Sequence, residues 1–102
     1  MPKIKSEYDD LDKYKNDYGD IVYYKKDTGE LHNPYGPAFI SKYGNKFYYI
    51  NSKCHRLDGP ARIYIDGKEF YYINNLNLSK GEFEYHPERL KFLRKEHLIC
   101  LK

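Results

Sequence analysis

A segment of this chain recurs at a fixed offset of 23 residues, and no other feature of the sequence constrains the fold as strongly. The five residues Phe47–Asn51 return unchanged as Phe70–Asn74. The pattern His-x-x-x-Gly-Pro-Ala also occurs twice, beginning at His32 and again at His55. In a chain of 102 residues, this period predicts a single domain that stacks copies of one small structural unit.

The limits of the copies can be read from the same offset. Copy one covers residues 24–46, and copy two covers residues 47–69. Copy three begins at Phe70 and then loses the pattern, because Leu78 stands where a third histidine is expected. Residues 23–75 are therefore expected to hold two and a half repeats.

Each copy predicts a β-hairpin. Residues 61–65 alternate between apolar and bulky polar side chains, and Asp66-Gly67 is typical of a two-residue type I′ turn. In that register Ile63 faces Phe70, and copy one repeats the arrangement around Tyr43-Gly44. The side chains expected on the inner, buried face are Ala38, Ile40, Phe47, Tyr49, Ala61, Ile63, Phe70 and Tyr72.

The Gly-Pro-Ala step predicts where each hairpin begins. Pro60 fixes φ and cannot donate to a strand ladder, so it suits the start of a strand after a bend. His32 and His55 then lie at equivalent bends. We expect each ring to bond loop backbone, because a structural repeat explains both histidines without a metal or a catalytic role.

The repeat unit Phe-Tyr-Tyr-Ile-Asn-x-x-x-His-Arg-x-Asp-Gly-Pro-Ala-x-x-x-x-x-Gly resembles the MORN-variant repeats of phages, large DNA viruses and bacteria. The resemblance covers residues 24–75. It departs from the family pattern at Asn51-Ser52, where Asn-Gly is usual, and at Asn33, where Arg is usual. It implies stacked antiparallel hairpins in an open, twisted sheet, and a role as an interaction or assembly surface.

The two ends of the chain carry different signals. Residues 1–22 are mildly acidic and are expected to form an N-terminal extension. Residues 79–101 predict a helical cap, since Ser79 and Glu82 form a capping box and Pro87 suits the first position of a second helix. The expected fold class is α+β: an open, twisted antiparallel sheet of stacked hairpin repeats, capped by C-terminal helices.

The second expected helix, from Pro87 to about Cys100, carries apolar side chains on two faces. Leu90 and Leu93 share one stripe, whereas Phe92 and Ile99 lie nearly opposite. Such a helix is expected to be sandwiched, either between the sheet and the N-terminal segment or between the sheet and a partner. The second arrangement would give a homodimer through this helix.

Composition excludes several classes of protein. The formal net charge of +3 is too small to indicate a nucleic-acid-binding protein, and the sequence has no apolar run that would insert into a membrane. Two cysteines make no disulfide framework and suit a reducing compartment. We therefore expect a cytoplasmic protein, in the host cytoplasm if a phage encodes it.

The sequence holds no recognisable catalytic or cofactor motif. A phosphate-binding glycine loop, a nucleophile elbow, paired zinc cysteines and His-Glu-x-x-His are all missing, so we expect neither an enzyme nor a cofactor or metal site. His97 and Cys100 have the spacing of two metal ligands. A zinc site would need His86 and Cys54 to converge on them, and that alternative stays open.

The preferred hypothesis is a non-catalytic protein-interaction module, of the kind that serves a phage or virus as an accessory protein binding and inhibiting a host protein. The alternative is nucleotide or single-stranded nucleic-acid binding by stacking on a Tyr-rich sheet face. With 13 tyrosines in the chain, such a face would also arise in a sheet that is only solvated and binds nothing. The expected partner-binding residues, on the outer sheet face and the second helix stripe, are Phe39, Tyr48, Arg62, Tyr64, Tyr71, Phe92 and Ile99.

Overall fold

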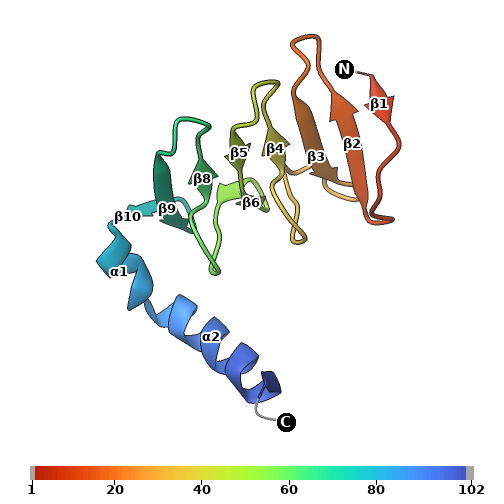
Figure 1. Ribbon diagram of the computed structural model, residues 1–102. Coiled ribbons are helices and arrows are strands. Elements are labelled where there is room, and N and C mark those ends of the chain that lie inside the picture. Colours follow the sequence, from red (N-terminus) through yellow and green to blue (C-terminus); the bar gives the residue numbers. More distant parts are fainter. Residues whose placement is uncertain (1, 101–102) are drawn as a thin grey trace.

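A computed structural model describes the backbone of residues 2–100 and the side chains of residues 2–95. The fold is α+β, an antiparallel sheet of hairpin strands followed by two short helices (Figure 1). The strands are β1 (Lys3–Ile4), β2 (Leu11–Lys15), β3 (Ile21–Lys25), β4 (Phe39–Ile40), β5 (Lys46–Phe47), β6 (Tyr49–Ile50), β7 (Lys53–Cys54), β8 (Arg62–Ile63), β9 (Glu69–Ile73) and β10 (Leu76–Leu78). The helices are α1 (Lys80–Glu84) and α2 (Pro87–Cys100). The expected fold class is confirmed at this level.

The hairpins lie side by side in chain order. The main sheet has the order β1-β2-β3-β4-β5-β8-β9-β10, while β6 and β7 pair with each other as a small second sheet. Figure 1 shows β1 at one end of this row and the two helices leading away from the β10 end. The N-terminal strand and the helices therefore lie at opposite ends of the sheet.

The N-terminal segment contributes strands to the sheet. β1 and β2 both lie within residues 1–22, and β2 pairs with β3 along its whole length. The loop between β2 and β3 is closed by hydrogen bonds from Asn16 N to the Asp20 carbonyl (3.0 Å) and from Gly19 N to the Asn16 carbonyl (3.1 Å). The same two bonds close the β4–β5 and β8–β9 loops, so β2–β3 is a further hairpin of the same kind.

The hairpin loops are one residue longer than the sequence predicted. In copy two, Tyr64 N donates to the Lys68 carbonyl (2.9 Å), and Gly67 adopts a φ of 94°. This is a three-residue loop with a left-handed glycine, and Gly44 takes the same conformation in copy one. The two-residue type I′ turns occur elsewhere, at Asn51-Ser52 and Asn74-Asn75, where all four residues have positive φ.

The longer loops shift the strand pairing by one residue. Phe39 faces Phe47, and Arg62 faces Phe70, so the predicted pairing of Ile63 with Phe70 is wrong. Since side chains alternate between faces, a shift of one residue moves a whole strand's side chains to the other face. Phe70, predicted to be buried, is 39% exposed.

The shifted register produces a continuous line of aromatic rings on one face, which we call the aromatic row. Neighbouring ring centroids lie 5.4 to 5.7 Å apart. Its members, in spatial order, are Phe39, Phe47, Tyr64 and Phe70. The predicted inner stripe is thus divided, with Phe47 and Phe70 on the face of the row.

Ala38 and Ala61 are the most buried residues of the repeat, as predicted, with no exposed surface. Each joins three strands through its backbone. Ala38 N donates to the Phe47 carbonyl (3.0 Å), and the Ala38 carbonyl accepts from Tyr23 N (2.8 Å). Ala61 makes the equivalent bonds with Phe70 (2.9 Å) and Tyr48 (2.8 Å).

His32 and His55 bond the loop backbone, as predicted. Nδ1 of His32 accepts from Asn51 N, and Nδ1 of His55 accepts from Asn74 N, each at 3.0 Å. Both donors lie in the type I′ turn of the following copy, so each histidine links one copy to the next. Burial lowers the pKa of both imidazoles below the usual value of 6.5, with a smaller effect of Lys25 on His32.

The helical segment begins as predicted. Ser79 Oγ accepts from Glu82 N (3.1 Å) and the Glu82 carboxylate accepts from Ser79 N (2.8 Å), which completes the capping box of α1. Phe83 of α1 is buried against the Tyr71 ring (4.6 Å). α2 begins at Pro87 but is not sandwiched against the N-terminal segment, because β1 lies at the far end of the sheet.

The loop glycines generate a first prediction. Gly67→Ala should lower the free energy of unfolding by about 1–2 kcal/mol, because an L side chain is strained at positive φ although no atom lies within 4 Å of the new Cβ. Gly81→Ala is the matched control. Gly81 lies inside α1 in equally open space, and alanine there should raise stability by about 0.5–1 kcal/mol. Urea denaturation of both variants is the measurement, and equal effects would contradict the loop geometry.

The two histidines generate a prediction about pH. Their folded pKa values lie below the unfolded value of 6.5, so they contribute stability that is complete above pH 6.5 and declines as the pH falls below it. The melting temperature should therefore drop between pH 7.5 and 5.5. In the His32→Asn/His55→Asn variant the amide oxygen can still accept the turn N–H but does not titrate. Thermal melts of this variant should be flatter with pH; an unchanged slope would assign the effect to other groups.

Candidate functional site

A cavity of about 560 Å³ opens between the histidine loops of copies one and two. A volume of this size is typical of sites that hold a small ligand or a peptide side chain. Its wall is mostly loop and aromatic surface, and α2 closes one side. The lining residues are Asn33, Pro34, Tyr35, Gly36, Tyr48, Ile50, His55, Arg56, Leu57, Asp58 and Phe92.

Helix α2 is fixed beside this cavity by Arg89. A guanidinium N–H of Arg89 donates to the Leu57 carbonyl, and the same guanidinium lies 4.6 Å from the centre of the Phe83 ring. These contacts join α2 both to the copy-two loop and to α1. Phe92, one turn further along, therefore becomes part of the cavity wall.

Arg56 is the principal charged group of the cavity. Its guanidinium lies 4.1 Å from the centre of the Tyr48 ring, pairs with the Asp58 carboxylate (2.8 Å) and donates to the Pro60 carbonyl (3.0 Å). The Asp58 side chain is 60% exposed, so this ion pair is strongly screened by solvent. Among residues 2–95, the Tyr48 hydroxyl has no hydrogen-bond partner.

His55 presents a donor rather than a base. Its Nδ1 accepts the Asn74 N–H, so the neutral ring carries its proton on Nε2. Burial lowers its pKa; Glu88 raises the pKa by a smaller amount, and His86 lowers it slightly further. The cavity therefore combines aromatic walls with donor groups from His55, Arg56 and Tyr48.

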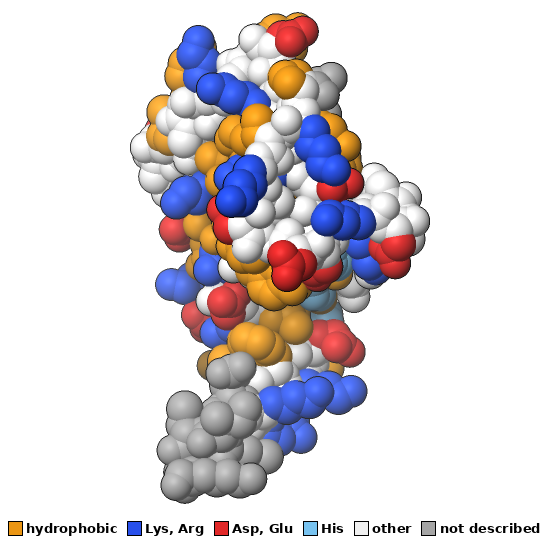
Figure 2. All heavy atoms as spheres, turned by 90° about the vertical axis from the view of Figure 1, so that its right-hand side faces the viewer, with side chains coloured by type: hydrophobic (Ala, Val, Ile, Leu, Met, Phe, Trp, Pro, Cys, Tyr) orange, Lys and Arg blue, Asp and Glu red, His pale blue; other side chains and the backbone are white. Residues whose placement is uncertain are grey.

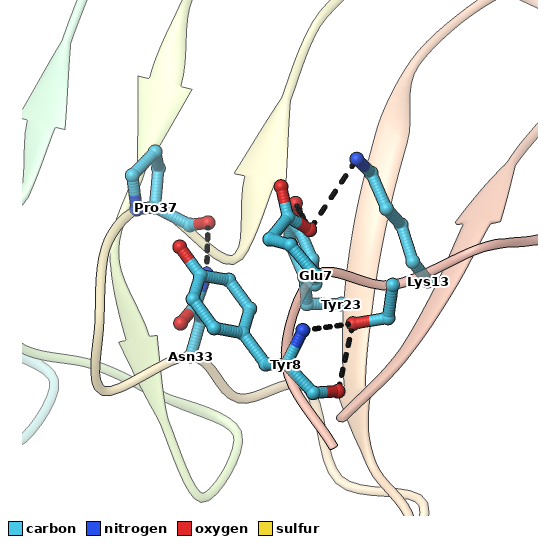
Figure 3. Close-up of polar contacts among 7 residues, drawn as sticks. Glu7, Tyr8, Lys13, Tyr23, Asn33 and Pro37 are labelled. Carbon is cyan, nitrogen blue, oxygen red and sulfur yellow. Dashed lines mark hydrogen bonds and ion pairs between the residues drawn. The ribbon is translucent and has the colours of Figure 1, made fainter. Parts of the chain in front are cut away.

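Tyr23, directly before copy one, bonds the Ala38 carbonyl as Tyr48 bonds the Ala61 carbonyl, and this equivalent position is already filled by the chain itself (Figure 3). The Tyr8 ring packs on Tyr23 (centroids 5.8 Å apart) and stacks on Tyr35 (4.6 Å). The buried Tyr23 donates its hydroxyl hydrogen to Glu7 (2.7 Å), and Lys13 completes the cluster at 3.4 Å from the same carboxylate. The bond from Tyr23 lowers the pKa of Glu7, while burial and then Glu7 raise the pKa of Tyr23.

The aromatic row lies on the other face of the sheet and holds Arg62. The Arg62 guanidinium lies between the rings of Phe47 (5.5 Å) and Tyr72 (4.9 Å), and one of its N–H groups reaches the Tyr49 hydroxyl (3.5 Å). Its Nε is buried without a hydrogen-bond partner, and no carboxylate of residues 2–95 forms an ion pair with it.

The structure divides the predicted site residues into separate groups. Phe39, Arg62 and Tyr64 lie together along the aromatic row. Tyr48 and Phe92 line the cavity, although they are 44 positions apart in the chain. Tyr71 is covered by Phe83. The expectation that Phe39, Tyr48, Tyr64 and Tyr71 share one face is wrong, because the strand register differs by one residue. The Ile99 side chain lies outside the described residues.

Several cavity residues were not predicted. Arg56, Asp58 and Tyr35 were not among the predicted binding residues, yet all three line the cavity. The signal that could have found them is a difference between the copies at aligned positions. Asn33 becomes Arg56, and Tyr35 becomes Asp58, so charged groups replace neutral ones at the same two places.

Figure 2 views the molecule from the N-terminal end of the sheet. Hydrophobic side chains gather where the sheet meets the helical part, and basic and acidic side chains are mixed over the rest of this face. In the part of the chain that the structure describes, no three His, Cys, Asp or Glu side chains cluster as metal ligands. No helix in that part has the length and apolar character needed to cross a membrane. His97 and Cys100 have side chains outside the described residues.

No protein-family model matches the chain, and neither a curated protein nor a solved structure is detectably similar to it. The functional argument therefore rests on the site itself.

The cluster around Glu7 generates a third prediction. Tyr23→Phe removes one charge-assisted hydrogen bond and keeps the buried ring, so it should lower the free energy of unfolding by about 1.5 kcal/mol. Tyr18→Phe is the control, since Tyr18 is 78% exposed at a loop tip and should change stability little. Urea denaturation at pH 7 measures both. Equal values for the two variants would show that the bond to Glu7 does not hold the N-terminal segment in place.

Proposed function

We propose that this protein is a non-catalytic interaction module that binds a protein partner in the cavity between the two histidine loops. The observation that carries the proposal is the meeting of Tyr48, which lies between β5 and β6, with Phe92 of α2 in one open cavity with aromatic walls. Aromatic side chains beside an arginine are the residues that dominate binding energy in protein interfaces. The resemblance to MORN-variant repeats supports the same class of function.

The chemistry of the cavity supports binding more than catalysis. His55 is held by the turn of the following copy, and Arg56 is held by Asp58 and the Pro60 carbonyl. Among residues 2–95, the cavity lining includes no serine or cysteine that could act as a nucleophile. Nucleic-acid stacking is less favoured, because Tyr48 and Tyr71 are separated from the tyrosine of the aromatic row. An accessory role directed at a host protein remains part of this proposal through the resemblance alone.

A photo-crosslinking amino acid tests the location of the interface. Placed at position 92, inside the cavity wall, it should form a covalent adduct with the partner in lysate of the source organism or its host. Placed at position 93, the next residue of the same helix but outside the cavity lining, it should form much less of the same adduct. Tyr48→Ala should abolish the adduct formed from position 92. Equal adducts from both positions would move the interface to the exposed face of α2.

A further inference from the structure

The two copies offer the same binding position in two states, one filled and one open. Tyr23 and Tyr48 occupy equivalent places, because each donates its N–H to a buried alanine carbonyl (2.8 Å) and each carbonyl accepts from the following histidine N–H (3.1 Å). Asn33 and Arg56 are equivalent as well, each donating to the carbonyl of the following proline at 3.0 Å. What fills copy one is therefore a guide to what copy two can accept.

The filled position shows which chemistry the site takes. An acidic residue accepts the hydroxyl hydrogen of the strand tyrosine, as Glu7 does from Tyr23. The next residue is aromatic and places its ring against the strand tyrosine and the loop, as Tyr8 does against Tyr23 and Tyr35. These two neighbouring side chains, in a short segment with no strand pairing of its own, cover the position in copy one.

The open position offers matching groups. No group of residues 2–95 accepts from the Tyr48 hydroxyl, so it can donate to a carboxylate as the Tyr23 hydroxyl does in copy one. Arg56 adds a positive charge where copy one has the neutral Asn33, and its present partner Asp58 is largely exposed. The residue equivalent to Tyr35 in copy two is Asp58, so the aromatic walls for a ring come instead from Tyr35 of the preceding copy and from Phe92.

We propose that the copy-two cavity recognises an extended segment of a partner protein that carries an acidic residue followed directly by an aromatic one. The carboxylate accepts from Tyr48 and is attracted by Arg56, and the aromatic ring packs between Tyr35 and Phe92. This inference rests on the proposed function and specifies the chemistry of the partner.

The chain supplies its own probe for the test. A synthetic peptide of residues 4–12 contains the Glu7-Tyr8 pair, and it is titrated into the isotope-labelled full-length protein while backbone amide resonances are followed. We expect saturable shifts at Tyr48, His55 and Phe92. Peptides with Glu7→Gln or Tyr8→Ala should bind about tenfold more weakly, the effect of one charge-assisted hydrogen bond or one buried ring.

The Arg56→Asn variant tests the role of the charge without a strong risk of unfolding, since copy one already uses asparagine to bond the same carbonyl. It should bind the parent peptide about tenfold more weakly but bind the Glu7→Gln peptide as the natural protein does. If the variant fails to fold, Phe92→Ala is used instead and tests the aromatic contact. Loss of that wall should weaken binding of the parent peptide, and Tyr8→Ala in the peptide should then cause little further loss.

Three results would overturn the inference. One is an absence of saturable shifts; another is a set of shifts centred on Glu7, Tyr8 and Tyr23, which would mean that the peptide only replaces the chain's own segment. The third is a dimer in sedimentation that Phe92→Ala dissociates, which would make a second copy the occupant. If the crosslink from position 92 forms while the peptide produces no cavity shifts, the interface stands and the acidic–aromatic chemistry is wrong.

Discussion

The sheet depends on the two alanines that follow a Gly-Pro step. Ala38 and Ala61 are completely buried, and each uses both backbone groups to join the strand before it and the strand after it. A side chain larger than a methyl group would push the loop away from the strand below, because the interior is close-packed at this point. The preceding proline has no N–H to satisfy in that crowded place. The period of the repeat follows from this junction, since each hairpin begins from it.

The same junctions also create the cavity between the histidine loops. Each alanine carbonyl accepts from a tyrosine N–H, and the histidine after that tyrosine bonds the turn of the next copy. Successive histidine loops are thereby held next to one another at fixed spacing, and the space between two loops becomes a site. That space is filled where the segment of Glu7 and Tyr8 covers it, at Tyr23. The scaffold and the site thus share one set of backbone bonds.

Local chemistry explains which features the sequence predicts well. The capping box at Ser79, the start of α2 at Pro87, the buried alanines and the histidine bonds all depend on residues close in the chain or on the repeat itself. The register could not be predicted, because two-residue and three-residue loops both use a left-handed glycine, and Asp66-Gly67 fits either. The β2–β3 hairpin was not predicted, because Tyr18-Gly19 recurs as Tyr43-Gly44 at an offset of 25 residues, whereas the repeat has an offset of 23. The cavity depends on where Arg89 fixes α2, a contact between distant segments.

The position at Tyr23 is filled and the position at Tyr48 is open for different physical reasons. The segment that covers copy one is covalently tethered, so its effective concentration at Tyr23 far exceeds that of any free partner. No tethered segment covers Tyr48 among residues 2–95, and the Arg56–Asp58 pair that partly shields it is exposed and screened. A carboxylate from outside can take the place of Asp58 at small cost, because Asp58 returns to water when it leaves the guanidinium. Within residues 2–95, the chain thus fills the position at Tyr23 with its own segment and leaves the equivalent position at Tyr48 open.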